Sequence, residues 1–247
     1  MAAVGAYSVF FFAFKLKLSI TLAILLGIIF TGLLGILLDK LVFLPMRKKK
    51  SSTMVMLVAS LGAFTLLQAT IAMLFTSQFQ TLSGLIENQK IYTIFTASIT
   101  QIQVIAIFSA LVIFLGLKLL LKFTRFGQAV VAVSDDEEVA KIVGINTNQI
   151  ISRVFFLGSA VTGIAGIFIG LDTGMEPTMG LVLLLSSVVA AIVGGVRSLS
   201  GAFLGAFLVA LAENFGIWKI AGEWRPAIAF GILILFLLFR PQGIIKE

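Results

Sequence analysis

The fold is decided by the stretch LSITLAILLGIIFTGLLGILL at residues 18–38, which contains no charged side chain. An α-helix of roughly 20 apolar residues crosses a hydrocarbon core about 30 Å thick. Further uncharged runs follow along the chain, at residues 51–86, 91–117, 154–171, 177–196, 198–212 and 226–239. Because these runs are continuous rather than alternating, they predict spanning helices and not spanning strands.

The composition agrees with a lipid environment. Of the 247 residues, 60% are hydrophobic and only 12% are charged, and the mean hydropathy is +1.14. A soluble domain carries roughly 25% charged residues. We therefore predict an all-α, polytopic helical membrane protein, built as one transmembrane domain over residues 1–247. About seven spanning helices are expected, near 18–38, 54–76, 103–121, 151–171, 181–196, 201–217 and 224–240. Residues 1–14 are expected to form a partial N-terminal helix whose beginning is absent.

The lysines and arginines predict the orientation. With seven spans, one side collects thirteen of them, at positions 40, 47, 48, 49, 50, 118, 122, 125, 141, 153, 197, 240 and 246, and the other side keeps five, at positions 15, 17, 90, 219 and 225. Basic loops remain in the cytoplasm. The loops 39–53 and 122–150 and the C-terminus are therefore expected to be cytoplasmic. The net charge of +7 is explained by this bias and predicts no nucleic-acid binding.

Several classes of function are excluded by missing residues. The chain has no His and no Cys, so imidazole bases, thiolate nucleophiles and the usual zinc sites are excluded. No GxxxxGK[ST] motif is present to bind ATP phosphates. Asp occurs only at positions 39, 135, 136 and 172, so no pair of acids lies within a span, as an ion-coupled carrier would often require. We predict no catalytic, metal or cofactor site, and a protein that is not itself an enzyme.

One segment expected in the cytoplasm, TRFGQAVVAVSDDEEVAKIVGIN at residues 124–146, carries helix signals. Ser134 and Glu137 have the spacing of a capping box, and the acids that follow Ser134 would lie in the first turn, where the helix dipole favours them. Gly144 would end the helix. Spacings of three and four residues place Val139, Ile142 and Val143 on one face. A helix of about nine residues is predicted between this cap and this stop. The candidate residues for docking on a partner are Ser134, Asp135, Asp136, Glu137, Glu138, Val139, Ile142, Val143 and Gly144.

This helix has two interpretations. It could be a solvated helix or rest on the inner leaflet, but helices that bind anionic lipid are usually basic on their polar face. Its N-terminal end is acidic, which favours a protein partner that has an apolar cleft and a basic rim.

Several stretches of the chain resemble a known family. The stretch 124–146 is similar to the cytoplasmic loop of LivH-type permeases, the membrane subunits of branched-chain amino acid ABC importers. The resemblance continues through SSTMVMLVASLGAFTLLQ at 51–68, GSAVTGIAGIFIG at 158–170, AAIVGGVRSLSGAFLGA at 190–206 and LLFRPQGI at 237–244. Such permeases usually begin with a further membrane helix, and by this resemblance we expect residues 1–14 to correspond to a piece that follows that helix. The chain has Ser186-Ser187 where many amino acid permeases carry Lys-Ala.

The resemblance implies a multi-pass protein of a bacterial or archaeal cytoplasmic (inner) membrane, together with its partners and mechanism. Such a permease pairs with a second permease subunit and docks on cytoplasmic ATPase subunits through a short helix within the coupling segment 124–150. An extracytoplasmic substrate-binding protein delivers the solute. ATP hydrolysis on the separate subunits then drives alternating access.

Candidate pathway residues are small or polar groups within the expected spans. Gly163, Gly166 and Gly170 either allow close helix packing or leave room for the solute. Glu213 is an acid inside an expected span, where a charge is costly. Either it pairs with Lys219 or Arg225 near the helix end, or it lines the pathway with Asn214, Ser186 and Ser187.

The sequence alone does not identify the transported solute. The family's commonest solutes are branched-chain amino acids, and close relatives transport urea or short amides. A secondary solute carrier is the alternative from another class.

Overall fold

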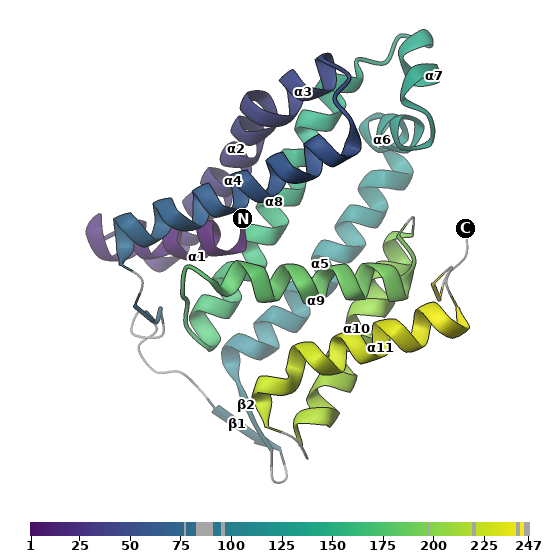
Figure 1. Cartoon of the computed structure of the whole chain (residues 1–247). Coiled ribbons are helices and arrows are strands. Elements are labelled where there is room, and N and C mark those ends of the chain that lie inside the picture. The colour runs from purple at the N-terminus through teal and green to yellow at the C-terminus, as the bar shows by residue number, and fades with distance from the viewer. Residues whose placement is uncertain are drawn as a thin grey trace. The chain divides into compact units, whose positions relative to one another are not determined.

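A computed structural model describes residues 1–76, 78–82, 91–94, 97–196, 198–218, 221–240 and 243–244. Contacts divide the chain into two compact units, Met1–Met179 and Gly180–Glu247, and each unit is described by itself. Figure 1 labels the elements along the chain.

The first unit is mainly helical. Its helices are α1 (Ala2–Phe10), α2 (Ile20–Leu38), α3 (Leu44–Lys48), α4 (Thr53–Phe75), α5 (Gln101–Phe123), α6 (Arg125–Asp135), α7 (Glu137–Ile142) and α8 (Thr147–Asp172). Two π-helical turns, Phe11–Lys15 and Asp39–Phe43, follow α1 and α2 directly. The strands β1 (Ile91–Ile94) and β2 (Ala97–Thr100) pair antiparallel, with Ile91 opposite Thr100.

The core of this unit is the packing of α1, α2 and α8 against one another. Small residues allow their backbones to approach closely. A Cβ atom on Gly5 of α1 would lie 2.5 Å from the carbonyl oxygen of Gly163 in α8. A Cβ atom on Gly27 of α2 would lie 2.8 Å from Cγ2 of Val9, which is fully buried. Close approach of this kind is how helices associate where lipid removes the hydrophobic force between them.

The helices α4 and α5 have few buried positions within the chain. In α4 only Ile71 is buried, and in α5 only Ile102, although both helices are apolar on all sides. A helix with this pattern lies in lipid or against another protein chain.

The helices of the second unit are α9 (Met179–Gly194), α10 (Leu199–Ile217) and α11 (Arg225–Phe239), and a 3-10 turn (Gly222–Trp224) precedes α11. Only the first residue of α9, Met179, is counted with the first unit. Where α9 and α10 meet, a Cβ atom on Gly205 would lie 2.6 Å from the backbone nitrogen of Gly194. Gly195 has φ +111°, so the chain turns sharply there before Ser198 caps α10 by accepting from the Gly201 backbone N–H.

The predicted fold class is confirmed. Within the described residues, five helices are long and apolar enough to span a membrane: Ile20–Lys48, Thr53–Phe75, Gln101–Phe123, Thr147–Asp172 and Leu199–Ile217. The spans expected at 181–196 and 224–240 form shorter apolar helices, Met179–Gly194 and Arg225–Phe239, as do residues Ala2–Lys15. The helix that begins at Ile20 continues to Lys48 rather than ending near residue 38.

Candidate functional site

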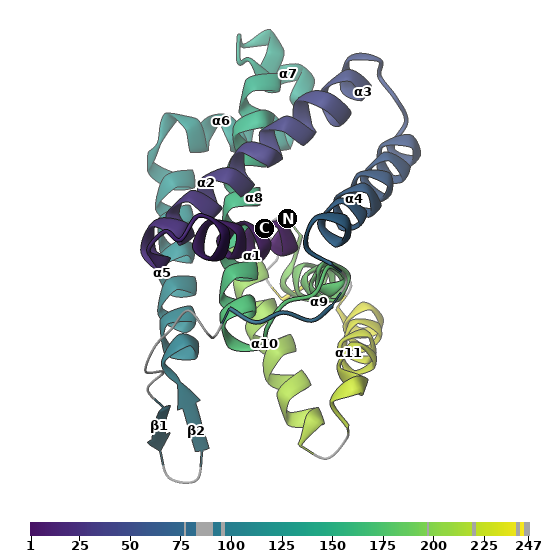
Figure 2. The same ribbon diagram turned by 90° about the vertical axis from the view of Figure 1, so that its left-hand side faces the viewer.

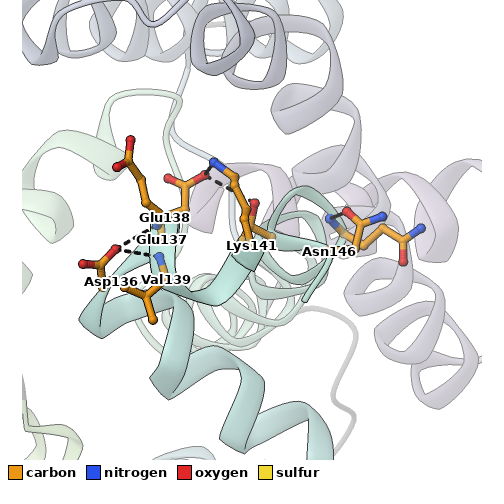
Figure 3. Close-up of polar contacts among 8 residues, drawn as sticks. Asp136, Glu137, Glu138, Val139, Lys141 and Asn146 are labelled. Carbon is orange, nitrogen blue, oxygen red and sulfur yellow. Dashed lines mark hydrogen bonds and ion pairs between the residues drawn. The ribbon is translucent and has the colours of Figure 1, made fainter. Parts of the chain in front are cut away.

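The short helix α7 follows α6 after a single residue of extended backbone, Asp136, with φ −150° and ψ 111°. One oxygen of its carboxylate, Oδ1, accepts from the backbone N–H groups of Glu138 and Val139, at 2.8 and 3.0 Å. Figure 3 shows these two bonds. Asp136 is therefore the N-cap of α7.

The predicted capping residue was wrong. Ser134 and Asp135 are the last residues of α6, and only Glu137 and Glu138 lie in the first turn of α7. An N-cap needs non-helical backbone, and the single break in the helical backbone falls at Asp136. The predicted helix of about nine residues is consequently six residues long.

The predicted C-terminal stop is confirmed. Gly144 has φ +90°, and its backbone N–H donates to the carbonyl of Lys141 while that of Ile145 donates to Ala140. These two bonds are the Schellman ending of an α-helix, which favours glycine at the left-handed position.

The predicted apolar face of α7 is exposed. The exposed fractions are 52% for Val139, 84% for Ile142 and 74% for Val143 at the helix end, whereas Ala140 in the same helix is 3% exposed. Among the residues that the structure describes, little packing covers the three branched side chains. An exposed apolar patch with acidic residues beside it is suited to contact another protein.

Glu137 attaches α7 to the start of α8. Its Oε1 atom accepts from Nζ of Lys141 at 2.6 Å and from the hydroxyl of Thr147 at 3.3 Å; the Lys141 contact is drawn in Figure 3. The hydrogen bond from Lys141 is the main cause that lowers the pKa of Glu137. Partial burial opposes this shift, and the charge of Lys141, the Thr147 hydroxyl and the charge of Arg47 reinforce it.

A buried polar cluster lies at the same end of the first unit, and sequence reasoning missed it. Asp39 is fully buried in the π-helical turn after α2. Its Oδ1 atom lies 2.7 Å from Nη2 of Arg47 in α3, and its Oδ2 atom accepts from the hydroxyl of Ser152 in α8 at 2.5 Å. The ion pair is close but not aligned as a hydrogen bond, and Nε of Arg47 is buried with no hydrogen-bond partner in the described structure. The cluster joins α2, α3 and α8.

The candidate pathway glycines of α8 lie in helix contacts. A Cβ atom on Gly163 would lie 3.0 Å from Cβ of Thr31 in α2, and one on Gly166 would overlap the backbone carbonyl of Ala2. A Cβ atom on Gly170 would lie 3.0 Å from Cδ1 of Leu82. All three glycines are buried, which favours the packing interpretation; a role in the pathway stays a prediction.

The polar pathway candidates of the second unit separate into two kinds. The hydroxyl of Ser186 donates to Oε1 of Glu213 at 3.4 Å, which links α9 to α10. Ser187 and Asn214 instead donate to backbone carbonyls of their own helices, those of Leu183 and Ala210.

Glu213 was expected to pair with Lys219 or Arg225 if it lies near a helix end. Between the described residues, no ion pair joins Glu213 to Arg225, and Lys219 lies outside the described residues. The Glu213 carboxylate accepts from the Ser186 hydroxyl.

The opposite end of α8 has its own polar contacts. Asp172 accepts from the hydroxyl of Thr100 through Oδ1 and from Nε2 of Gln103 through Oδ2, both at 3.1 Å. Thr100 and Gln103 also form the capping box of α5. Asp172 thus fixes the start of α5 to the end of α8, at the end of the unit away from α7.

An apolar cavity of about 410 Å³ lies among α1, α2 and α4. Its walls are formed chiefly by aliphatic and aromatic side chains, among them Val4, Phe12, Leu34 and Ile71. Tyr7 also lines it, and its hydroxyl is buried without a hydrogen-bond partner among the described residues.

Comparison with known proteins shows to which family the chain belongs. The model of the family described as "Branched-chain amino acid transport system / permease component" matches residues 1–237. The chain is 28% identical to the high-affinity branched-chain amino acid transport system permease protein BraD of Pseudomonas aeruginosa, over 89% of this chain and 72% of the relative. It is 27% identical to LivH of Escherichia coli K12 over the same shares, and 28% identical to the xylose transport system permease protein XylH of that bacterium over 45% of this chain and 30% of the relative.

No solved structure matches the chain. The family consists of membrane permease subunits of ABC transporters, which are not themselves enzymes. The family match covers nearly the whole chain, including both units and the segment that carries α7. The chain therefore belongs to the branched-chain amino acid transport permease family, as a multi-pass membrane permease subunit.

Proposed function

We propose that this permease is driven by ATP hydrolysis on cytoplasmic ATPase subunits, and that α7 is the helix on which they dock. The observation that carries the proposal is the exposed apolar face of α7, on a helix fixed at both ends. Asp136 caps its start, Gly144 ends it, and Glu137 holds it to α8. A helix held in this way can transmit a push from a partner, whereas a loosely attached loop would absorb it.

The charge distribution supports a cytoplasmic position for α7. The contacts of Asp39 with Ser152 and of Glu137 with Thr147 place the segment after α2 and the segment before α8 at one end of the first unit. This end carries Arg47 to Lys50 together with Lys122, Arg125 and Lys141. Basic segments are retained in the cytoplasm. The same bias supports a cytoplasmic C-terminus.

The remaining proposed partners are those that the resemblance to LivH-type permeases implies. A second permease subunit completes the membrane part, and the exposed apolar surfaces of α4 and α5 leave room for such contacts or for lipid. A substrate-binding protein delivers solute to the opposite end, near Asp172. Closure of the ATPase subunits then moves α7 and switches the pathway between outward- and inward-facing states.

Branched-chain amino acids are the proposed solutes, because the relatives with the most extensive similarity are named for their transport. Urea and short amides are the alternatives within the family. Uptake of labelled leucine in competition with isoleucine, urea and acetamide separates these solutes. Competition by isoleucine alone supports the proposal, and competition by urea or acetamide contradicts it.

The docking proposal is tested by Val139→Asp and by the double reversal Glu137→Lys and Glu138→Lys, in chains that insert normally into the membrane. Both variants should lose co-purification of the ATPase subunits and leucine uptake. Val139→Ile keeps the apolar face and serves as the matched control. Unchanged ATPase co-purification and uptake in the two disruptive variants would refute the assignment of α7 and leave a carrier without an ATPase as the better reading.

A further inference from the structure

The buried cluster of Asp39, Arg47 and Ser152 lies at the base of α7. Figures 1 and 2 show α3 and α7 at the same end of the first unit. Thr147, which binds Glu137 of α7, and Ser152, which binds Asp39, are both in the first turns of α8. Two separate polar contacts on the first turns of α8 therefore connect α7, through this helix, with the end of α2.

Because these contacts are buried, breaking them is costly in free energy. Asp39 and Thr147 are 0% and 1% exposed, and the side chain of Arg47 is 15% exposed. A buried carboxylate that loses its partners is left as an uncompensated charge, which is strongly unfavourable. The three elements that hold Asp39 can therefore move only together, unless the whole cluster rearranges.

The backbone at Asp39 is also unusual. Residues Asp39–Phe43 form a π-helical turn inside the long helix Ile20–Lys48. Turns of this kind are rare and occur frequently at functional sites. Asp39 is the first residue of this turn and directly follows the uncharged run 18–38. The acid therefore lies within the continuous helix and not beyond its end.

The electrostatics connect Arg47 to α7 as well. Its charge contributes to lowering the pKa of Glu137, after the larger contribution of Lys141. Arg47 also retains a buried Nε donor with no partner in the described structure. The guanidinium is thus within electrostatic range of the docking helix while it neutralises Asp39.

We propose that Asp39, Arg47 and Ser152 are the positioning residues that transmit movement of α7 to the membrane helices α2 and α8. The proposal rests on the docking function proposed for α7 and adds the route by which docking reaches the membrane. It predicts that weakening the cluster separates ATP hydrolysis from transport without detaching the ATPase subunits.

The test uses the full transporter, purified with the subunits that co-purify with the chain and reconstituted in proteoliposomes. ATP hydrolysis and uptake of labelled leucine are measured together for Ser152→Ala, Asp39→Asn and the double variant Asp39→Asn with Arg47→Gln. The ATP hydrolysed per leucine transported should rise roughly 3- to 10-fold in each. Ser109→Ala is the matched control, because Ser109 is also half-buried but donates within α5, to the carbonyl of Ala106.

Three outcomes are decisive. A raised ratio of ATP to leucine with normal co-purification supports the proposal. An unchanged ratio in Ser152→Ala and in the double variant overturns it, even if Asp39→Asn alone fails to fold, because the double variant buries no unpaired charge. If the unmodified chain retains no ATPase subunit, the docking function itself fails, and the cluster then has no movement of α7 to transmit.

Discussion

At the scale of single residues, Asp39 shows what sequence could not settle. Its charge marks the expected end of the first span, yet the residue is fully buried and the helix continues to Lys48. Its ion-pair partner, Arg47, is eight positions along the same helix, and the hydroxyl that donates to it, that of Ser152, is 113 positions away in another helix. Helical spacing reveals contacts three or four residues apart, so neither Arg47 nor Ser152 could be predicted as a site residue.

Gly166 offers a test of the packing interpretation. Gly166→Ala should lower the stability of the first unit by about 1–3 kcal/mol, because the new methyl group overlaps the Ala2 carbonyl and the core must shift. Thermal unfolding in detergent measures the effect. Gly158→Ala in the same helix is the control, since a Cβ atom there meets nothing within 4 Å. Equal stability of the two variants would contradict close packing of α1 on α8.

Glu137 predicts a pH dependence. Its folded-state pKa is lowered, so the stability from its contacts is fully present above the unfolded pKa of about 4.3. That stability is lost as the pH falls through the lowered, folded value. Amide exchange of residues 137–143, corrected for intrinsic rates, should therefore stay slow down to about pH 4.3 and accelerate below it. Glu137→Gln should show no such acceleration, and a transition above pH 5 in the unmodified chain would contradict the assignment.

At the scale of elements, the apolar runs predicted most of the helices. The spans expected at 54–76, 103–121 and 201–217 are observed at Thr53–Phe75, Gln101–Phe123 and Leu199–Ile217. Lipid makes this possible, because a spanning helix must satisfy its backbone internally and be apolar along its length.

Elements outside the apolar runs were harder to predict. The hairpin of β1 and β2 was not expected, although Ile91-Tyr92-Thr93-Ile94 is rich in β-branched and aromatic residues. The helix α6 was also missed. Thr124 carries a signal for it, since its hydroxyl accepts from the Gly127 backbone N–H as an N-cap.

The cap of α7 can be tested directly. Asp136→Ala should cost α7 about 1 kcal/mol, because the backbone N–H groups of Glu138 and Val139 lose their acceptor. Faster amide exchange in α7 reports the loss. Ser134→Ala, two residues earlier, should leave exchange in α7 unchanged. The opposite ranking of the two variants would restore Ser134 as the cap.

At the scale of the whole molecule, the docking role proposed for α7 depends on which side of the membrane this helix occupies. The position of α7 at one end of the first unit follows from its contacts with α8, whereas Asp172, Thr100 and Gln103 occupy the other end. The two ends must face opposite sides of the membrane if α8 spans it. A docking role for α7 requires that its end face the cytoplasm.

The most direct measurement labels single cysteines with a membrane-impermeant maleimide. The chain has no native cysteine, so Val143→Cys at the exposed end of α7 and Thr173→Cys at the exposed opposite end of α8 each give one site. Val143→Cys should react in inside-out vesicles and stay unlabelled in right-side-out vesicles, with Thr173→Cys showing the reverse. Labelling of Val143→Cys from the outside, or from neither side, would contradict a cytoplasmic docking helix and with it the ATP-driven mechanism.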